Sequence, residues 1–226
     1  VGDAAVPALQ KRMIRMAKEL NRVTITATQM MESMIEAPVP TRAEVSDVAN
    51  AVLDGTDAVM LSAETAAGKY PVETIEAMAR VCVEADRSEI VSFDTAFLHR
   101  TFSRIDQSIA MSALFVAHHM KVKAVVSLTE SGSTALWMSR LDSGVPIYAL
   151  TPLESSRRRM CLYREVHPLL MNYHAQEREA LLLEAEQKLL EAGIVEKGDL
   201  IVLTIGEPIG KSGGTNTLKI VRVGEH

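Results

Sequence analysis

Four hydroxyl side chains gather within six residues in the segment 129–134, TESGST. An apolar run at 123–128 precedes this segment and predicts a buried strand, and a helix is predicted to follow at 133–141. Free N–H groups and the positive dipole end at a helix start both favour an anion, and hydroxyls add hydrogen-bond donors. The segment therefore predicts a phosphate-binding loop. Its candidate residues are Thr129, Ser131, Gly132, Ser133 and Thr134.

The same segment has a simpler explanation, in which Ser131 or Ser133 only caps the helix. More hydroxyls are present than one cap needs, and this favours a ligand. Glu130 acts in the other direction, because its carboxylate disfavours a dense negative charge unless the side chain points away.

A second loop of similar character, KSGGTNT, spans residues 211–217. A long β-hairpin loop explains it equally simply, since Gly-Gly is ordinary there. However, parallel α/β sheets collect their binding loops along one edge, so both loops could close on one phosphorylated ligand. The candidate residues in this second loop are Gly213, Gly214 and Thr215.

Two further hydroxyl residues, Thr28 and Ser62, each follow a short apolar run that predicts a strand. The runs are 23–27 and 57–61, and the second has almost no polar alternation, as in a parallel strand buried on both faces. In an α/β barrel, side chains at the carboxyl ends of the strands build the active site, so both hydroxyls are candidate catalytic residues. Taken singly, either hydroxyl is also explained as an ordinary helix cap.

Helical patterns surround these two strands at 7–20, 41–53 and 71–86. The second helix opens with a capping box, in which Thr41 and Glu44 can each bond the other's backbone N–H. The positions expected to face inward on the third helix are Ile75, Met78, Cys82 and Val83.

An alternating pattern restarts in the second part of the chain and predicts a three-layer α/β/α sandwich. The glycine-rich loop between its last two strands favours antiparallel pairing of that pair. The expected helices are 106–120, 133–141, 155–164 and 176–192. The expected strands are 123–128, 146–150, 166–171, 199–205 and 216–223. The predicted domains are 1–86 and 105–226, joined by a connection at 87–104.

Composition limits the classes of function. The 226 residues carry a net charge of −5 and no basic stripe interleaved with aromatics, so nucleic acid is not an expected partner. No segment is long and apolar enough to cross a membrane, and no signal peptide opens the chain. Cys82 and Cys161 fit small buried hydrophobic positions, which is typical of a reduced, cytoplasmic protein, and they offer no metal site.

Several motifs together resemble one known family. The end of the catalytic barrel of pyruvate kinase resembles ITATQMMESM, PTRAEVSDVANAVLDGTDAVMLSAET and GKYPVETI. The C-terminal regulatory domain of the same family resembles TESGSTAL and GGTNTLKI. The resemblance covers essentially the whole chain. It implies an α/β fold: an incomplete TIM-barrel segment of about two β/α units, followed by the three-layer sandwich.

The resemblance implies that the full enzyme is a phosphotransferase of glycolysis. It would transfer a phosphoryl group from phosphoenolpyruvate to ADP, giving pyruvate and ATP, with Mg²⁺ (or Mn²⁺) and K⁺. It also implies that Thr28 contacts the substrate near its carboxylate and methylene carbon, and that Ser62 joins a proton-delivering water network. The family's catalytic lysine, metal-binding glutamate and aspartate, and K⁺ ligands precede these strands and have no counterparts here. We therefore expect this chain alone to be inactive and to hold no metal.

The two hydroxyl-rich loops match the family's allosteric effector site. Glu130 stands where some members have a basic residue, and the loop near His174 has no tryptophan, although Arg178 could assist. We therefore expect a single-phosphate effector, AMP or a sugar monophosphate, ahead of fructose bisphosphate, with no effector binding as the third alternative. The family further implies a cytoplasmic homotetramer. A free-standing effector-binding and oligomerisation module is the alternative class of function.

Overall fold

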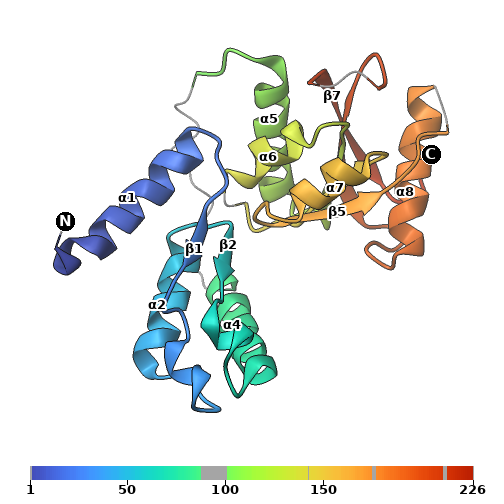
Figure 1. Cartoon of the computed structure of the whole chain (residues 1–226). Helices are drawn as coiled ribbons and strands as arrows, with labels where there is room; N and C mark the ends of the chain where they lie inside the picture. The colour runs from blue at the N-terminus through green and yellow to red at the C-terminus, as the bar shows by residue number, and fades with distance from the viewer. Residues whose placement is uncertain (1, 88–100, 142, 175–176, 211–212, 226) are drawn as a thin grey trace. The chain divides into compact units, whose positions relative to one another are not determined.

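The computed structural model shows two compact units (Figure 1). The first unit comprises residues 1–92 and the second residues 93–226, and each is described by itself. The connection predicted at 87–104 lies largely outside the residues that the structure describes. The described residues are 2–87, 101–141, 143–174, 177–210 and 213–225.

The first unit alternates helices with two strands. The long helices and both strands lie within two residues of their predicted ranges. The elements are α1 (Val6–Glu19), β1 (Ile25–Ala27), α2 (Arg42–Leu53), β2 (Ala58–Met60), α3 (Ala63–Ala66) and α4 (Pro71–Asp86), with 3₁₀ turns η1 (Asp3–Ala5) and η2 (Glu32–Ile35).

Strands β1 and β2 pair in parallel, with Ala27 opposite Met60. Their amino-terminal ends are joined by side chains. The Thr26 hydroxyl donates to Thr56 Oγ1 at 3.0 Å, and the Thr24 backbone N–H donates to Asp57 Oδ2 at 2.9 Å. These bonds tie the two strand starts together and so fix the register in which the carboxyl ends meet.

The core of the first unit lies between α2, α4 and the residues around η2. Helix α2 begins with the predicted capping box: Glu44 N donates to Thr41 Oγ1 at 3.3 Å, and Thr41 N donates to Glu44 Oε2 at 2.7 Å. The buried apolar residues of this core are Met30, Met31, Met34, Val48, Ala51, Ala77 and Met78.

Several apolar positions in the first unit are more exposed than predicted. Ile75 and Val83 were expected to face inward, but they are 55% and 48% exposed, so that prediction was wrong. Met60 is likewise exposed, although β2 was expected to be buried on both faces. These residues are not among the buried residues of the core between α2 and α4, and the first unit leaves each of them partly exposed.

The second unit is built on one five-stranded sheet. Its helices are α5 (Ile105–Met120), α6 (Ser133–Ser139), α7 (Glu154–Met160) and α8 (Arg178–Glu191). Its strands are β3 (Ala124–Leu128), β4 (Ile147–Thr151), β5 (Val166–Leu170), β6 (Leu200–Gly206) and β7 (Thr215–Arg222).

The sheet of the second unit has the strand order β5-β4-β3-β6-β7. All neighbouring strands are parallel except β6 and β7, whose antiparallel pairing confirms the prediction. Helix α8 covers one face of the sheet, while α5 and α6 lie on the other (Figure 1). Strand β3 is the central strand of the sheet and is buried at every position. The loop that follows β3 therefore lies at the middle of the sheet edge.

Two surface features complete the second unit. Cys161 is exposed at the C-cap position just past α7, so the expectation of a buried cysteine there was wrong. Arg157 and Arg158 both pair with Glu154 on the surface of α7. Within the described residues, no helix has the length and apolar character needed to span a membrane.

Candidate functional site

Thr28 and Ser62 lie at the same edge of the first unit, just past the carboxyl ends of β1 and β2. Both are exposed. Ser62 stands at the N-cap position of α3, but its side chain makes no capping hydrogen bond, and the Thr28 hydroxyl donates to its neighbour's carbonyl, Ala27 O, at 2.6 Å. The cap explanation therefore receives no support from either hydroxyl, and both residues are exposed at the same end of the two-stranded sheet.

The backbone at the end of β1 is unusual. Thr28 has φ of 74° and Gln29 has φ of 55°, in a region that side chains other than glycine rarely adopt, and a β-branched residue least of all. Such strain persists only where the surrounding structure holds it, and it collects at functional sites. The strand therefore ends in a conformation that costs stability, which favours a role in binding for this turn.

Glu64 was not singled out from the sequence, yet it joins the ends of both strands. Its buried carboxylate accepts from the Ser62 backbone N–H at 2.7 Å and from the Met31 backbone N–H at 3.4 Å. Burial raises the pKa of Glu64, but the backbone hydrogen bonds outweigh this and leave the pKa below its ordinary value. The only available signal was an acidic residue two positions after a strand-ending serine.

In the second unit, the segment 129–134 forms a tight loop between β3 and α6. Gly132 has φ of 79°, and its N–H donates to Thr129 Oγ1 at 3.0 Å. A Cβ atom at Gly132 would lie 2.8 Å from Met160, so glycine is required there for two reasons. The Ser131 hydroxyl donates to Ser133 Oγ at 3.2 Å, and no side chain caps α6.

The second predicted loop meets the first at the same edge of the sheet. The hydroxyl oxygens of Thr134 and Thr215 lie 2.6 Å apart, although the residues are 81 positions apart in the chain. A cavity of about 20 Å³, lined in part by Thr129, Gly213 and Thr215, lies between the loops. Such a cavity holds about one water molecule, so a phosphate would have to bind at its mouth. Ser131 and Ser133 are half-buried and do not line it.

Acidic side chains border this edge. Glu130 and Tyr173 both line the cavity between the loops. Burial raises the pKa of Tyr173, and the negative charge of Glu130 raises it further. A second carboxylate, Glu207 Oε2, lies 3.5 Å from Arg178 Nη1. A cation is also present, because Arg104 Nη2, paired with Asp106 at 2.7 Å, lies 3.6 Å from where a Cβ atom at Gly213 would stand. Paired charges of both signs therefore border the loops.

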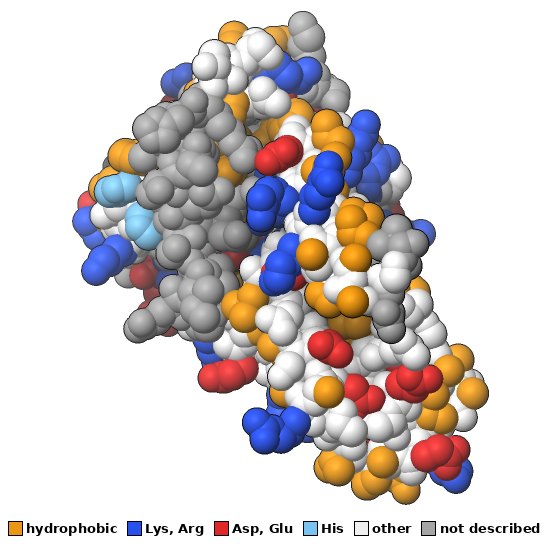
Figure 2. All heavy atoms as spheres, turned by 90° about the vertical axis from the view of Figure 1, so that its left-hand side faces the viewer, with side chains coloured by type: hydrophobic (Ala, Val, Ile, Leu, Met, Phe, Trp, Pro, Cys, Tyr) orange, Lys and Arg blue, Asp and Glu red, His pale blue; other side chains and the backbone are white. Residues whose placement is uncertain are grey.

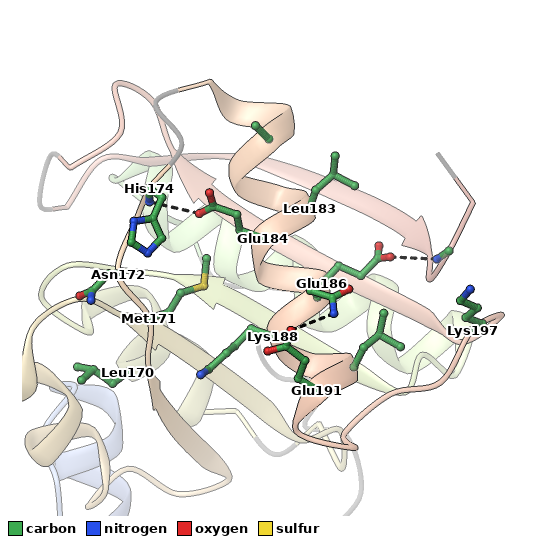
Figure 3. A pocket seen from close by; sticks show the side chains of 14 residues that line it. Leu170, Met171, Asn172, His174, Leu183, Glu184, Glu186, Lys188, Glu191 and Lys197 are labelled. Carbon is green, nitrogen blue, oxygen red and sulfur yellow. Dashed lines mark hydrogen bonds between the residues drawn. The ribbon is translucent and has the colours of Figure 1, made fainter.

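A larger hollow of about 940 Å³ lies between β5 and α8 (Figure 3). Apolar residues such as Leu170 and Leu183 line it together with charged ones such as Glu184 and Lys188. The His174 backbone N–H donates to Glu184 Oε2 at 3.3 Å across its rim. Its lining contains both positive and negative side chains but none of the hydroxyl residues of the two loops. The hollow is therefore separate from the predicted phosphate loops.

No group of three or more His, Cys, Asp or Glu side chains is placed to hold a metal ion in the part of the chain that the structure describes. On the face drawn in Figure 2, both charged and apolar side chains of the described residues lie at the surface. The chemistry visible here is therefore that of hydroxyls, backbone N–H groups and single carboxylates.

Comparison with known families divides the chain as the two units do. Residues 1–75 match the family described as "Pyruvate kinase, barrel domain", and residues 107–221 match "Pyruvate kinase, alpha/beta domain". The first unit, with its two parallel strands, and the second unit, with its five-stranded sheet, correspond to these two descriptions.

Individual relatives carry the same name. A "Pyruvate kinase II" of Salmonella typhimurium is 49% identical over 224 residues, which are 99% of this chain and 46% of the relative. The "Pyruvate kinase" of Haemophilus influenzae is 51% identical over 91% of this chain and 43% of the relative, and that of Thermotoga maritima is 41% identical over 96% and 46%. The chain thus spans about half the length of the curated relatives it matches. It belongs to the pyruvate kinase family, with the end of the barrel domain followed by the C-terminal α/β domain.

Proposed function

We propose that this chain supplies part of the phosphoenolpyruvate site of a pyruvate kinase, the enzyme that transfers a phosphoryl group to ADP and gives pyruvate and ATP. One observation carries the proposal: Thr28 and Ser62 are exposed together at the carboxyl ends of two parallel strands. Glu64 links the backbone on both sides of this edge. In a barrel, that edge is where substrates bind.

The two hydroxyls suit the last step of the reaction. Loss of the phosphoryl group leaves the enol of pyruvate, which must take up a proton at carbon. A hydroxyl can orient a water molecule or relay a proton at that position, so Thr28 would contact the substrate and Ser62 would hold the water. The family uses Mg²⁺ and K⁺, but the described residues do not fit a metal, so no step here is assigned to either ion.

The isolated chain should not catalyse the reaction. Phosphoryl transfer depends on cations that stabilise the moving group, and Thr28 and Ser62 cannot supply them. The test is an assay of the purified chain with phosphoenolpyruvate, ADP, Mg²⁺ and K⁺. Turnover by the chain alone would contradict this proposal.

A second assay tests the hydroxyls themselves. The chain is joined to the part of the Salmonella relative that lies outside the matched region, and Thr28→Ala is compared with Ser46→Ala, an exposed serine on α2. Loss of one acid–base or positioning group typically lowers the rate by about 10²–10⁴-fold, so Thr28→Ala should lower kcat on that scale while Ser46→Ala should not. Equal kcat values in both variants would remove Thr28 from the site.

A regulatory function for the second unit is proposed on a separate observation, the contact between Thr134 and Thr215 that joins the two loops. The ligand would be AMP or a sugar monophosphate, with fructose bisphosphate as the second choice, bound by the loop hydroxyls and the N–H groups around Gly132 and Gly214. Calorimetry with sugar phosphates before and after Ser131→Ala tests it, with Ser155→Ala on α7 as control. Unchanged binding in Ser131→Ala would exclude that residue.

A cytoplasmic homotetramer is the assembly that family membership favours. In the alternative class of function, the chain is a free-standing binding module that binds the effector without any part in catalysis.

A further inference from the structure

Arg178 is the first residue of α8, the helix that begins beside the two predicted phosphate loops. It lies one helical turn before Leu181, which lines the cavity between those loops, so both residues lie on neighbouring positions of the same helix face. Its guanidinium is already engaged. Nε and Nη2 lie 3.1 and 3.0 Å from Glu179 Oε1, and Nη1 lies 3.5 Å from Glu207 Oε2.

Glu207 is held firmly in this position. Its backbone N–H donates to Asn216 Oδ1 at 3.1 Å, and Asn216 Nδ2 donates back to Glu207 O at 2.9 Å. The Thr217 hydroxyl donates to Glu207 Oε2 at 3.2 Å. Strand β7 therefore holds the Glu207 backbone through Asn216, and its Thr217 supplies one hydrogen bond to the carboxylate besides the ion pair with Arg178.

The charges of this cluster cancel. Lys219 pairs with the second oxygen of Glu179, so Arg178 and Lys219 stand against Glu179 and Glu207. Two cations and two carboxylates give a net charge of zero. A ligand group with two negative charges would gain no net attraction here, and it would have to displace Glu207 to reach the guanidinium.

We propose that Glu207 determines the specificity of the effector site by excluding a second phosphate group. The inference rests on the proposed effector site. A sugar monophosphate needs only the loop hydroxyls and the N–H groups around them, so Glu207 does not interfere with it. A second phosphate group that reached Arg178 would meet the carboxylate of Glu207, 3.5 Å from the guanidinium, which is specificity by repulsion.

Glu207→Gln is a suitable test because the pair is exposed, and exposed ion pairs contribute little to folding. Glutamine keeps an oxygen for the Thr217 hydroxyl and removes the charge, which leaves the cluster at net +1. Binding of fructose 6-phosphate and fructose 1,6-bisphosphate is measured by calorimetry at low salt for the wild-type chain and the variant. The matched control is Glu225→Gln, whose carboxylate pairs with Arg222 at 3.7 Å in a similar exposed setting.

The wild-type chain should bind the monophosphate at least as tightly as the bisphosphate. In Glu207→Gln, affinity for the bisphosphate should rise by about tenfold or more relative to the monophosphate, on the scale of a charge pair near a protein surface, and the change should shrink as salt is added. Adding Arg178→Gln to the variant should abolish the gain.

Four results would overturn the inference. If fructose 6-phosphate binds and the ratio of affinities does not move in Glu207→Gln, Glu207 is not the determinant, although the effector site stands. An equal shift in Glu225→Gln, or a gain that survives Arg178→Gln, would show a general charge effect. If neither sugar phosphate binds the wild-type chain or the variant, the proposed effector site fails and the inference fails with it.

Discussion

At the scale of single residues, Glu64 decides how the two strand ends are held. A buried carboxylate that accepts from two backbone N–H groups binds them more weakly when it loses its charge, and it leaves both unsatisfied when it is displaced. Because the folded-state pKa of Glu64 lies below its ordinary value of 4.5, the stability that it contributes is fully present above that value. It is lost as the pH falls through the folded-state pKa.

Glu64→Gln should therefore lower the free energy of unfolding by about 1–3 kcal/mol at neutral pH, the usual cost of weakening buried hydrogen bonds. The loss should be smaller at low pH, where the wild-type carboxylate is protonated as well. Urea unfolding at several pH values measures it, with the exposed Glu73→Gln on α4 as control. A pH-independent difference between wild type and Glu64→Gln would contradict the assigned role.

Gly132 allows a second prediction with a matched control. Gly132 and Gly144 both have positive φ, 79° and 66°, but only Gly132 has a neighbour, Met160, within 2.8 Å of an added Cβ. Gly132→Ala should thus cost about 1–3 kcal/mol more than Gly144→Ala, since overpacking adds to the backbone strain. Thermal unfolding of both variants measures the difference, and equal melting temperatures would show that Met160 yields at no cost.

At the scale of elements, α2 shows where sequence and structure agree and where they part. The capping box of Thr41 and Glu44 is a local pattern and formed as predicted. The same carboxylate also accepts from Ser33 N and Ser33 Oγ, both at 2.6 Å, which joins α2 to η2. No spacing rule in the sequence points to that second pair of bonds.

Glu44→Gln should consequently destabilise the chain more than Thr41→Ala, for which about 1 kcal/mol is typical of a lost cap. Burial raises the pKa of Glu44, but the hydrogen bonds from Ser33 and Thr41 outweigh it and leave the pKa lowered. The stabilising effect is thus present above the ordinary pKa and is lost on acidification. Chemical unfolding of both variants at neutral pH tests the order, and a larger loss in Thr41→Ala would reverse it.

The same distinction runs through the fold. Helix starts, strand runs and the antiparallel pair β6–β7 depend on nearby residues, so the sequence predicted them. Burial of Ile75 and Val83 depends on what packs against α4, and periodicity alone shows only that they share a face. The contact between Thr134 and Thr215 could be predicted only on the condition that both loops lie at one edge of the sheet, and that depends on the order of the strands, which the sequence does not give. Glu64 and Glu207 escaped notice because single carboxylates acquire a role only from their partners.

At the scale of the whole molecule, the first unit exposes surface that a folded barrel would cover. Helix α1 and Leu20, the residue that follows it, carry a stripe of exposed apolar side chains: Met13, Met16 and Leu20 are 62%, 46% and 66% exposed. Strands β1 and β2 form a sheet of two strands, so among the described residues each has one edge without a neighbouring strand. Apolar surface and open strand edges both promote association between chains.

The isolated chain should therefore associate with itself, with an average mass in light scattering that rises between about 1 and 100 μM, the range in which exposed apolar surface drives association. Replacing Met13, Met16 and Leu20 with lysine should shift the chain toward the monomer, because the stripe loses its apolar character and gains like charge. A control with lysine at Leu153, Leu162 and Leu183, exposed residues of the second unit, should change the mass less. If the control disperses the chains and the α1 variant does not, association runs through the second unit, and the open part of the barrel is not the surface that drives it.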